Sequence, residues 1–236
     1  YLLLADDLPG MTARGFLRPG SQTGSSSLVV QLTHDLVDGG FGVNNRGSRF
    51  LGQYQGDAFV GFNSYTKRFE RTALRGLITG EGEELRYVEI NHEEQIGSEG
   101  TKLIFSTSYA ATEPGSKLEE FDIDGESTSF SLAANHPILR SRQENLYGRA
   151  VFNYRDSNSG DPLAVTDYED QVRALRFGLS YDRADSWGGV NQLSYDISKG
   201  LDIFGVQDNG IRSRANGDED FLKHNAEFVR LQSLSE

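Results

Sequence analysis

The chain has 236 residues, a formal net charge of −12 and a pI near 4.8. This acidic balance disfavours nucleic acid as a partner, because phosphate contacts need clustered Lys and Arg. The absence of cysteine excludes disulfides and thiolate metal sites. No window approaches the roughly 20 consecutive apolar residues of a membrane helix. A β-barrel does not need such a run, since only every second residue of its strands meets lipid.

The first part of the chain differs in pattern from the rest. Residues 1–7 are typical of the end of a helix, which Leu8-Pro9-Gly10 terminates. Residues 11–19 and 26–36 are predicted strands, joined by a Gly/Ser-rich turn into a β-hairpin. A helix end followed by a hairpin predicts the tail of a small α+β module, and we place its boundary after residue 37.

From residue 38 onwards, apolar and polar side chains alternate in segments of about ten residues, the period of two that a strand imposes. The predicted strands are residues 40–45, 51–63, 72–79, 85–94, 102–110, 128–136, 146–155, 172–182, 190–198 and 221–232. In residues 146–155, for example, Phe152 and Tyr154 share one face while Asn153 and Arg155 share the other. Residues 38–236 are therefore predicted to form one all-β domain.

The two faces of these strands differ as a membrane barrel requires. One face carries the Leu, Phe and Tyr that lipid favours. The other carries residues suited to a wet lumen, namely Arg149, Asn153, Arg155, Arg176 and Gln192. The sequence thus predicts a transmembrane antiparallel β-barrel, of which this chain would hold about ten strands.

The connections and the aromatic residues favour the same interpretation. Connections 111–127, 156–171 and 199–220 are long and acidic, whereas 95–101, 137–145 and 183–189 are shorter. Bacterial outer-membrane barrels have short periplasmic turns and longer external loops, which would place the N-terminal module in the periplasm. Aromatic residues near strand ends could form interfacial girdles, or could simply be good strand formers. They are Tyr54, Phe62, Tyr87, Tyr109, Tyr154, Tyr181, Trp187 and Tyr195.

No pattern in the chain indicates catalysis or a cofactor. His34, His92, His136 and His224 fall in separate segments without metal-ligand spacing, and no Gly-x-Ser-x-Gly elbow is present. The glycines around Thr79 resemble a phosphate loop only superficially, and residues 122–126 lack most ligands of a calcium loop. We therefore expect no enzymatic activity, no metal and no cofactor, and we expect both stretches to be turns or loops.

Several strings resemble, in order, the transporters of two-partner secretion systems (the TpsB family, haemolysin activation/secretion type). Residues 2–12, Leu-Leu-Leu-Ala-Asp-Asp-Leu-Pro-Gly-Met-Thr, resemble a junction within the second POTRA domain of that family. Residues 42–49 resemble its first barrel strand and loop, and residues 137–142 its proline-leucine-arginine turn. The segments 200–205, 221–223 and 231–232 also fit in order.

This resemblance implies a sixteen-stranded outer-membrane barrel preceded by two periplasmic POTRA domains. Such a protein recognises an exoprotein of the haemolysin or filamentous adhesin type in the periplasm and moves it across the outer membrane without ATP. Residues 1–37 would end the second POTRA domain, and residues 38–236 would form the first strands of the barrel. The family's arginine-glycine-aromatic loop motif would lie beyond Glu236, and Arg14-Gly15-Phe16 is a chance match.

Two other functional classes remain as alternatives. A passive porin or ligand-binding barrel would share the barrel pattern, but simple porins begin at the barrel rather than at a hairpin module. A soluble β-sandwich would have to pack the apolar faces on a second sheet, and it leaves the loop asymmetry unexplained. In a translocator, an edge strand of the hairpin could pair with an extended client through main-chain hydrogen bonds.

Overall fold

The computed structural model describes residues 2–22, 24–161, 166–206, 211–214 and 217–233. Most of these residues lie in strands. Among them, no helix has both the length and the apolar character needed to cross a membrane.

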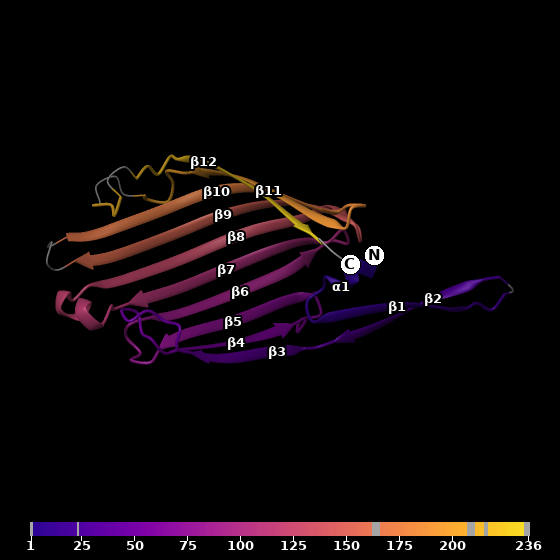
Figure 1. Ribbon diagram of the computed structural model, residues 1–236, viewed down its shortest axis with the longest axis horizontal. Helices are drawn as coiled ribbons and strands as arrows, with labels where there is room; N and C mark the ends of the chain where they lie inside the picture. The colour runs from indigo at the N-terminus through magenta and orange to yellow at the C-terminus, as the bar shows by residue number, and fades with distance from the viewer. Residues whose placement is uncertain (1, 23, 162–165, 207–210, 215–216, 234–236) are drawn as a thin grey trace.

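The chain begins with a short helix and a hairpin. Helix α1 (Leu2–Asp6) precedes β1 (Met11–Pro19) and β2 (Ser26–His34), which pair antiparallel from end to end. The helix ends at Asp6, and Gly10, which has a positive φ of 66°, lies in the turn that leads into β1. The predicted helix end and hairpin are confirmed, although β2 stops two residues before residue 36. Figure 1 shows the hairpin projecting away from the main sheet.

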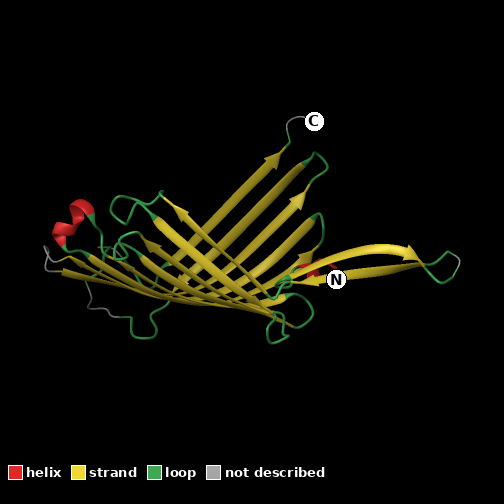
Figure 2. Ribbon diagram, turned by 90° about the horizontal axis from the view of Figure 1, so that it is seen from below, coloured by secondary structure: helices red, strands yellow, loops and turns green. Residues whose placement is uncertain are grey.

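The remaining strands form one antiparallel sheet in which each strand pairs with its neighbours in the chain. They are β3 (Val37–Asn44), β4 (Gln55–Asn63), β5 (Glu70–Thr79), β6 (Arg86–Ile96), β7 (Thr101–Thr112), β8 (Asp124–Arg140), β9 (Glu144–Asp161), β10 (Thr166–Ala184), β11 (Gly189–Gly200) and β12 (Leu222–Gln232). Figure 1 shows them side by side in chain order, and Figure 2 shows the curvature of the sheet. A curved up-and-down sheet of this kind is the wall of a β-barrel, so the predicted fold class is confirmed.

One of the predicted long loops, 156–171, is wrong. β9 and β10 continue as a paired ladder through residues 156–161 and 166–171, and only residues 162–165 lie outside the described part of the connection. Connection 111–127 is a long connection, as predicted, although β7 and β8 reduce it to residues 113–123, which contain the 3-10 helix η1 (Ser116–Phe121). The polar residues of these stretches lack the alternation that indicates a strand, yet an antiparallel ladder forms readily where it meets water.

The apolar and polar side chains separate onto the two faces of the sheet, as predicted. One cross-strand row on the apolar face consists of Phe105, Leu132, Phe152 and Leu175. The next row on the opposite face includes Ser106, Ser131 and Asn153. The buried hydrophobic residues of the described chain are only Ala111 and Ala174. The sheet therefore has no protein core of its own, and its apolar face matches a lipid-facing surface.

The aromatic residues predicted near strand ends are divided between the two faces of the sheet. Tyr109 and Tyr154 lie on the apolar face towards the end of the sheet that is remote from α1. Tyr181 lies on the same face towards the other end, next to the turn that carries Trp187. Tyr87 is an exception, because it is paired with Ala110 in a row of the polar face.

One ion pair is buried on the apolar face, in the half of the sheet that is remote from α1. Arg173 of β10 has a side chain only 1% exposed, and its Nη1 lies 2.7 Å from Oδ1 of Asp156 on β9. The guanidinium stacks over the Tyr154 ring at 3.4 Å and also donates to the backbone carbonyl of Arg155. A buried guanidinium is tolerated only with such partners, so Asp156 is the group that neutralises it.

Candidate functional site: the polar wall and its mouth

The candidate site is the polar face of the ten-stranded sheet together with the sheet end that adjoins α1. We call this face the polar wall and this end the proximal end, which carries the turns 64–69, 97–100, 141–143 and 185–188. The opposite, distal end carries the connections 45–54, 80–85, 113–123 and 201–221. The longer connections therefore gather at the distal end, as expected for a barrel with long external loops.

The structure brings the predicted lumenal residues onto one surface. Arg149, Asn153, Arg155, Arg176 and Gln192 all lie on the polar wall, on β9, β10 and β11. Arg149 forms an ion pair with Asp196 at 3.3 Å, two strands away. Gly178 lies between them, and a Cβ there would come within 2.4 Å of the Asp196 carboxylate. Glycine at this position leaves room for the ion pair to cross the wall.

Farther along the wall, two cations are bound only to neutral groups. Arg155 donates from Nε to the hydroxyls of Ser127 and Ser157, at 3.1 Å each. Arg176 donates to the side-chain oxygen of Asn153. Neither has an ion-pair partner in the described part of the chain. The middle of the wall therefore carries two cations whose charge no ion pair of the described residues neutralises.

The first attachment of the N-terminal segment to the barrel is a bidentate ion pair. Arg140, the last residue of β8, donates from Nε and Nη2 to the two carboxylate oxygens of Asp7, at 3.0 and 2.9 Å. Lys102 of β7 donates to the Asp7 carbonyl at 2.9 Å. Asn145 accepts from Arg140 at 3.0 Å and holds the guanidinium in place. Charge-assisted, two-pronged contacts of this type fix orientation as well as proximity.

The second attachment lies at the turn between β4 and β5. The Asn63 side chain is 1% exposed, and its Nδ2 donates to the Asp35 carbonyl and to the Asp38 carboxylate, at 3.0 Å each. Arg71 donates from Nη2 to Asp38 at 2.8 Å. Asp35 in turn donates its N–H to the Gly10 carbonyl at 2.8 Å. The two attachments, which we call the junction, hold α1 and the base of the hairpin at the proximal end of the polar wall.

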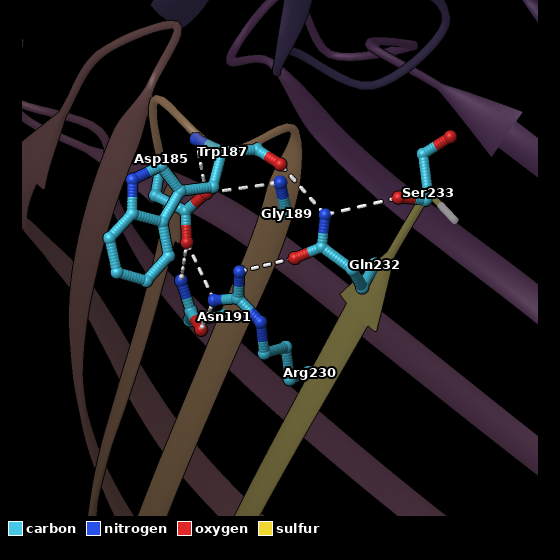
Figure 3. A network of polar contacts seen from close by, with 7 residues as sticks. All are labelled: Asp185, Trp187, Gly189, Asn191, Arg230, Gln232 and Ser233. Carbon is cyan, nitrogen blue, oxygen red and sulfur yellow. Dashed lines mark hydrogen bonds and ion pairs between the residues drawn. The ribbon is translucent and has the colours of Figure 1, made fainter. Parts of the chain in front are cut away.

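A network of polar contacts also orders the β10–β11 turn (Figure 3). The Asp185 carboxylate accepts hydrogen bonds from the N–H groups of Trp187 and Gly189 and from the Asn191 side chain, at 3.0 Å each. Arg230 of β12 donates to the same carboxylate at 2.6 Å. Arg230, with these other donors, holds the pKa of the Asp185 carboxyl well below its usual range. The turn is thereby tied to β12.

The pH response of this turn is a testable prediction. The pKa of Asp185 is lower in the folded protein than its ordinary value of 3.8, so the stability it contributes is present above that value and lost as the pH falls through the folded pKa. We expect the turn to stay ordered from pH 7 to about 4 and to loosen only at lower pH. Trp187 is the only tryptophan of the chain, so its fluorescence anisotropy reports on this turn directly.

Asp185→Asn is the matched variant for that measurement. It should lower the anisotropy of Trp187 already at pH 7 and make it independent of pH, because the charge that binds Arg230 is gone. A fall in the Trp187 anisotropy near pH 6 in the native protein would contradict the proposed role of Asp185. So would an anisotropy of the variant that changes with pH as in the native protein.

The other residues considered from the sequence form no site. His92, His136 and His224 lie on different strands, and each contacts one hydroxyl group: Thr72, Thr101 or Tyr195. His34 lies in the hairpin. Within the described residues, no group of three or more potential ligands could hold a metal. Residues 80–85 form a turn between strands, as predicted. The loop predicted at residues 122–126 is confirmed only at 122–123, because β8 begins at Asp124.

Sequence reasoning missed the junction residues. Asp7 and Arg140 are 133 residues apart, and no local pattern pairs them. Asn63 and Arg71 face each other across a turn, but a polar residue at a strand end is too common to indicate a buried network. The only local signal was the string 137–142, which ends β8 next to a register shift between Pro137 and Leu139.

The fold and the polar wall define the wall of an outer-membrane β-barrel. CdiB from Escherichia coli, a transporter of the TpsB type, has the same fold with a TM-score of 0.79 and 15% identity; the match covers 100% of this chain and 45% of CdiB. CdiB from Acinetobacter baumannii matches with a TM-score of 0.56 and 15% identity, over 83% of this chain and 38% of that protein. The chain thus spans less than half the length of either protein.

No family model matches the chain, and no match is found among curated proteins. At 15% identity, the similarity to the two CdiB structures shows the fold alone. The fold is therefore that of a TpsB-type outer-membrane barrel, and the similarity to the first CdiB includes the N-terminal hairpin because it extends over the whole chain.

Proposed function

We propose that this chain is part of an outer-membrane protein translocator of a two-partner secretion system. In this proposal, residues 1–37 end a periplasmic POTRA domain, and residues 38–236 begin the barrel through which the exoprotein leaves. The observation that carries the proposal is the junction, which holds a hairpin module at the proximal end of a polar wall. A passive pore has no need of a module fixed at its mouth.

The geometry supports a sequence of two binding steps. Within the described residues, β1 and β2 pair only with each other, so each has an open edge. An extended client can add to such an edge through main-chain hydrogen bonds, which demand little of its sequence. The client then meets the polar wall, where Arg155, Arg176 and their neutral partners offer a polar path. We propose no catalytic step and no cofactor.

The partner would be a secreted exoprotein of the haemolysin or filamentous adhesin type. This finer assignment rests on the strings of the sequence that resemble the TpsB family. It also requires the proximal end to face the periplasm, which the shorter turns at that end support.

A secretion assay with a hairpin variant tests the function. The full-length protein is produced with a candidate exoprotein in a Gram-negative host, and residues 12–33 are replaced by a short Gly/Ser linker. We expect the native protein to release exoprotein into the medium and the variant to leave it in the periplasm. The variant barrel should still migrate as a folded species in unheated electrophoresis samples.

The second candidate is a passive porin, which a polar wall with these two cations would also suit. Uptake of small sugars and ions in the same cells separates the two functions. If the native protein supports rapid uptake but releases none of the exoproteins tested, and if the hairpin variant behaves identically, the porin function replaces the proposed one.

A further inference from the structure

A cavity of about 520 Å³ lies between α1 and the polar wall at the proximal end. Leu4 of α1 and the following Asp7 form its cover, and the wall contributes residues from β6 to β11. The cavity therefore lies at the proximal end of the wall, beside the segment that leads from α1 into the hairpin. The kind of ligand that the cavity could bind can be inferred from which of its polar side chains already have a hydrogen-bond or ion-pair partner.

The charged groups of the cavity are paired within the protein. Lys102 donates to the Asp7 carbonyl at 2.9 Å and lies 3.6 Å from the Glu93 carboxylate. Arg149 is paired with Asp196, and the Asp7 carboxylate is bound by Arg140. A ligand would have to break one of these ion pairs to bind through charge. The cavity is therefore not built to select a charged ligand.

The neutral groups of the cavity, in contrast, are free. Five hydrogen-bonding side chains line it without a hydrogen-bond partner in the part of the chain that the structure describes; they are Gln95, Asn135, Tyr147, Ser180 and Ser194. They come from five strands, and Ser180 and Ser194 lie directly opposite each other. The Asn135 Oδ1 atom is shielded from solvent and still has no partner. A buried acceptor left unpaired costs free energy, so it calls for a donor that the described residues do not supply.

We propose that this cavity binds the extended main chain of a polypeptide in transit, an inference that rests on the proposed function. An unfolded client carries a donor N–H and an acceptor C=O on nearly every residue, and these groups need partners once they leave water. Free amide and hydroxyl groups can satisfy both kinds without regard to sequence, because they donate as well as accept. The Asn135 amide and the Ser180 and Ser194 hydroxyls, which line the cavity, bind the N–H and carbonyl groups of the client.

Photocrosslinking in cells that secrete the exoprotein tests this site. A benzophenone side chain replaces Ser180 in one variant and Ser131 in the other; Ser131 lies on the polar wall but does not line the cavity. We expect a crosslink from position 180 to the exoprotein, with a yield several times that from position 131. Because the charges are paired, the yield should be the same when acidic segments of the exoprotein are made neutral.

A second set of variants tests the chemistry. Asn135→Leu with Ser180→Ala and Ser194→Ala removes the free neutral groups, and Ser129→Ala with Ser131→Ala is the control on the same wall. The first set should lower the secretion rate about tenfold, as expected when one or two net hydrogen bonds to the client are lost. The control should secrete at the native rate, and both should form folded barrels.

Several outcomes would overturn the inference. If the exoprotein is secreted but position 180 gives no more crosslink than position 131, the proposed function stands and the binding site is wrong. Protection of position 180 by a neutral oligosaccharide, without any crosslink to polypeptide, would assign the cavity to sugar. If no exoprotein is secreted at all, the proposed function fails together with this inference.

Discussion

Replacing Asp156 by Ala is expected to destabilise the barrel by about 3 kcal/mol, because it leaves the Arg173 guanidinium buried without its counter-charge. Arg173 is 1% exposed and keeps only the Tyr154 ring and backbone carbonyls as partners. The Asp156 side chain as a whole is 34% exposed, so the pair is only partly buried and the expected loss lies at the lower end of the range for buried pairs. The measurement is the urea midpoint of unfolding of the refolded protein in detergent micelles.

A double-mutant cycle shows whether the loss comes from the unpaired charge. Arg173→Met removes the buried cation, so adding Asp156→Ala to it should cost much less than Asp156→Ala costs in the native protein. The exposed ion pair between Lys199 and Asp220 provides a matched control, because its side chains are 45% and 68% exposed. Asp220→Asn should change the stability by about 0–1 kcal/mol. Equal losses at Asp156 and Asp220 would show that Arg173 is not effectively buried.

The strands that the sequence predicts well are those whose two faces differ in chemistry. Along residues 146–155, apolar and polar side chains alternate, and the same residues form the middle of β9 with the predicted faces. The extension of β9 and β10 carries Asp, Ser, Asn and Gly on both faces, so no alternation distinguishes it from a loop. Its ladder continues the β9–β10 register of the alternating part, and pairing between two strands is not visible in a local pattern.

The sequence also predicts some features of the candidate site and misses others. The lumenal position of Arg149 and Arg176 follows from the period of two, and the structure places both on the polar wall. That Arg149 is neutralised by Asp196 depends on register across two strand pairs and on the absence of a side chain at Gly178. The side-chain oxygen of Asn135 has no hydrogen-bond partner among the described residues. A sequence pattern cannot predict that a partner is missing.

Gly10→Ala is expected to weaken the junction severely, for two reasons that act together. Gly10 has a φ of +66°, a conformation that costs a residue with a Cβ roughly 1–2 kcal/mol. A Cβ there would also lie 2.4 Å from the Asp35 carbonyl and 2.7 Å from Cβ of Asn63. Because Asn63 holds both Asp35 and Asp38, its displacement should release the base of the hairpin from the barrel. Protease cleavage between β2 and β3 should become at least several times faster, and secretion should fall.

Gly24 separates the two causes, since it shares the conformation of Gly10 but not its surroundings. Its φ is +84°, and a Cβ there would meet no atom within 4 Å. Gly24→Ala should therefore carry the conformational cost alone, at the tip of the hairpin, and leave both the cleavage rate between β2 and β3 and secretion near native values. If the two variants behave alike, contact at Gly10 is unimportant and the junction is not what positions the module. If only Gly10→Ala loosens the linker while the barrel stays folded, the packing of a single backbone position against Asn63 and Asp35 couples the hairpin to the polar wall.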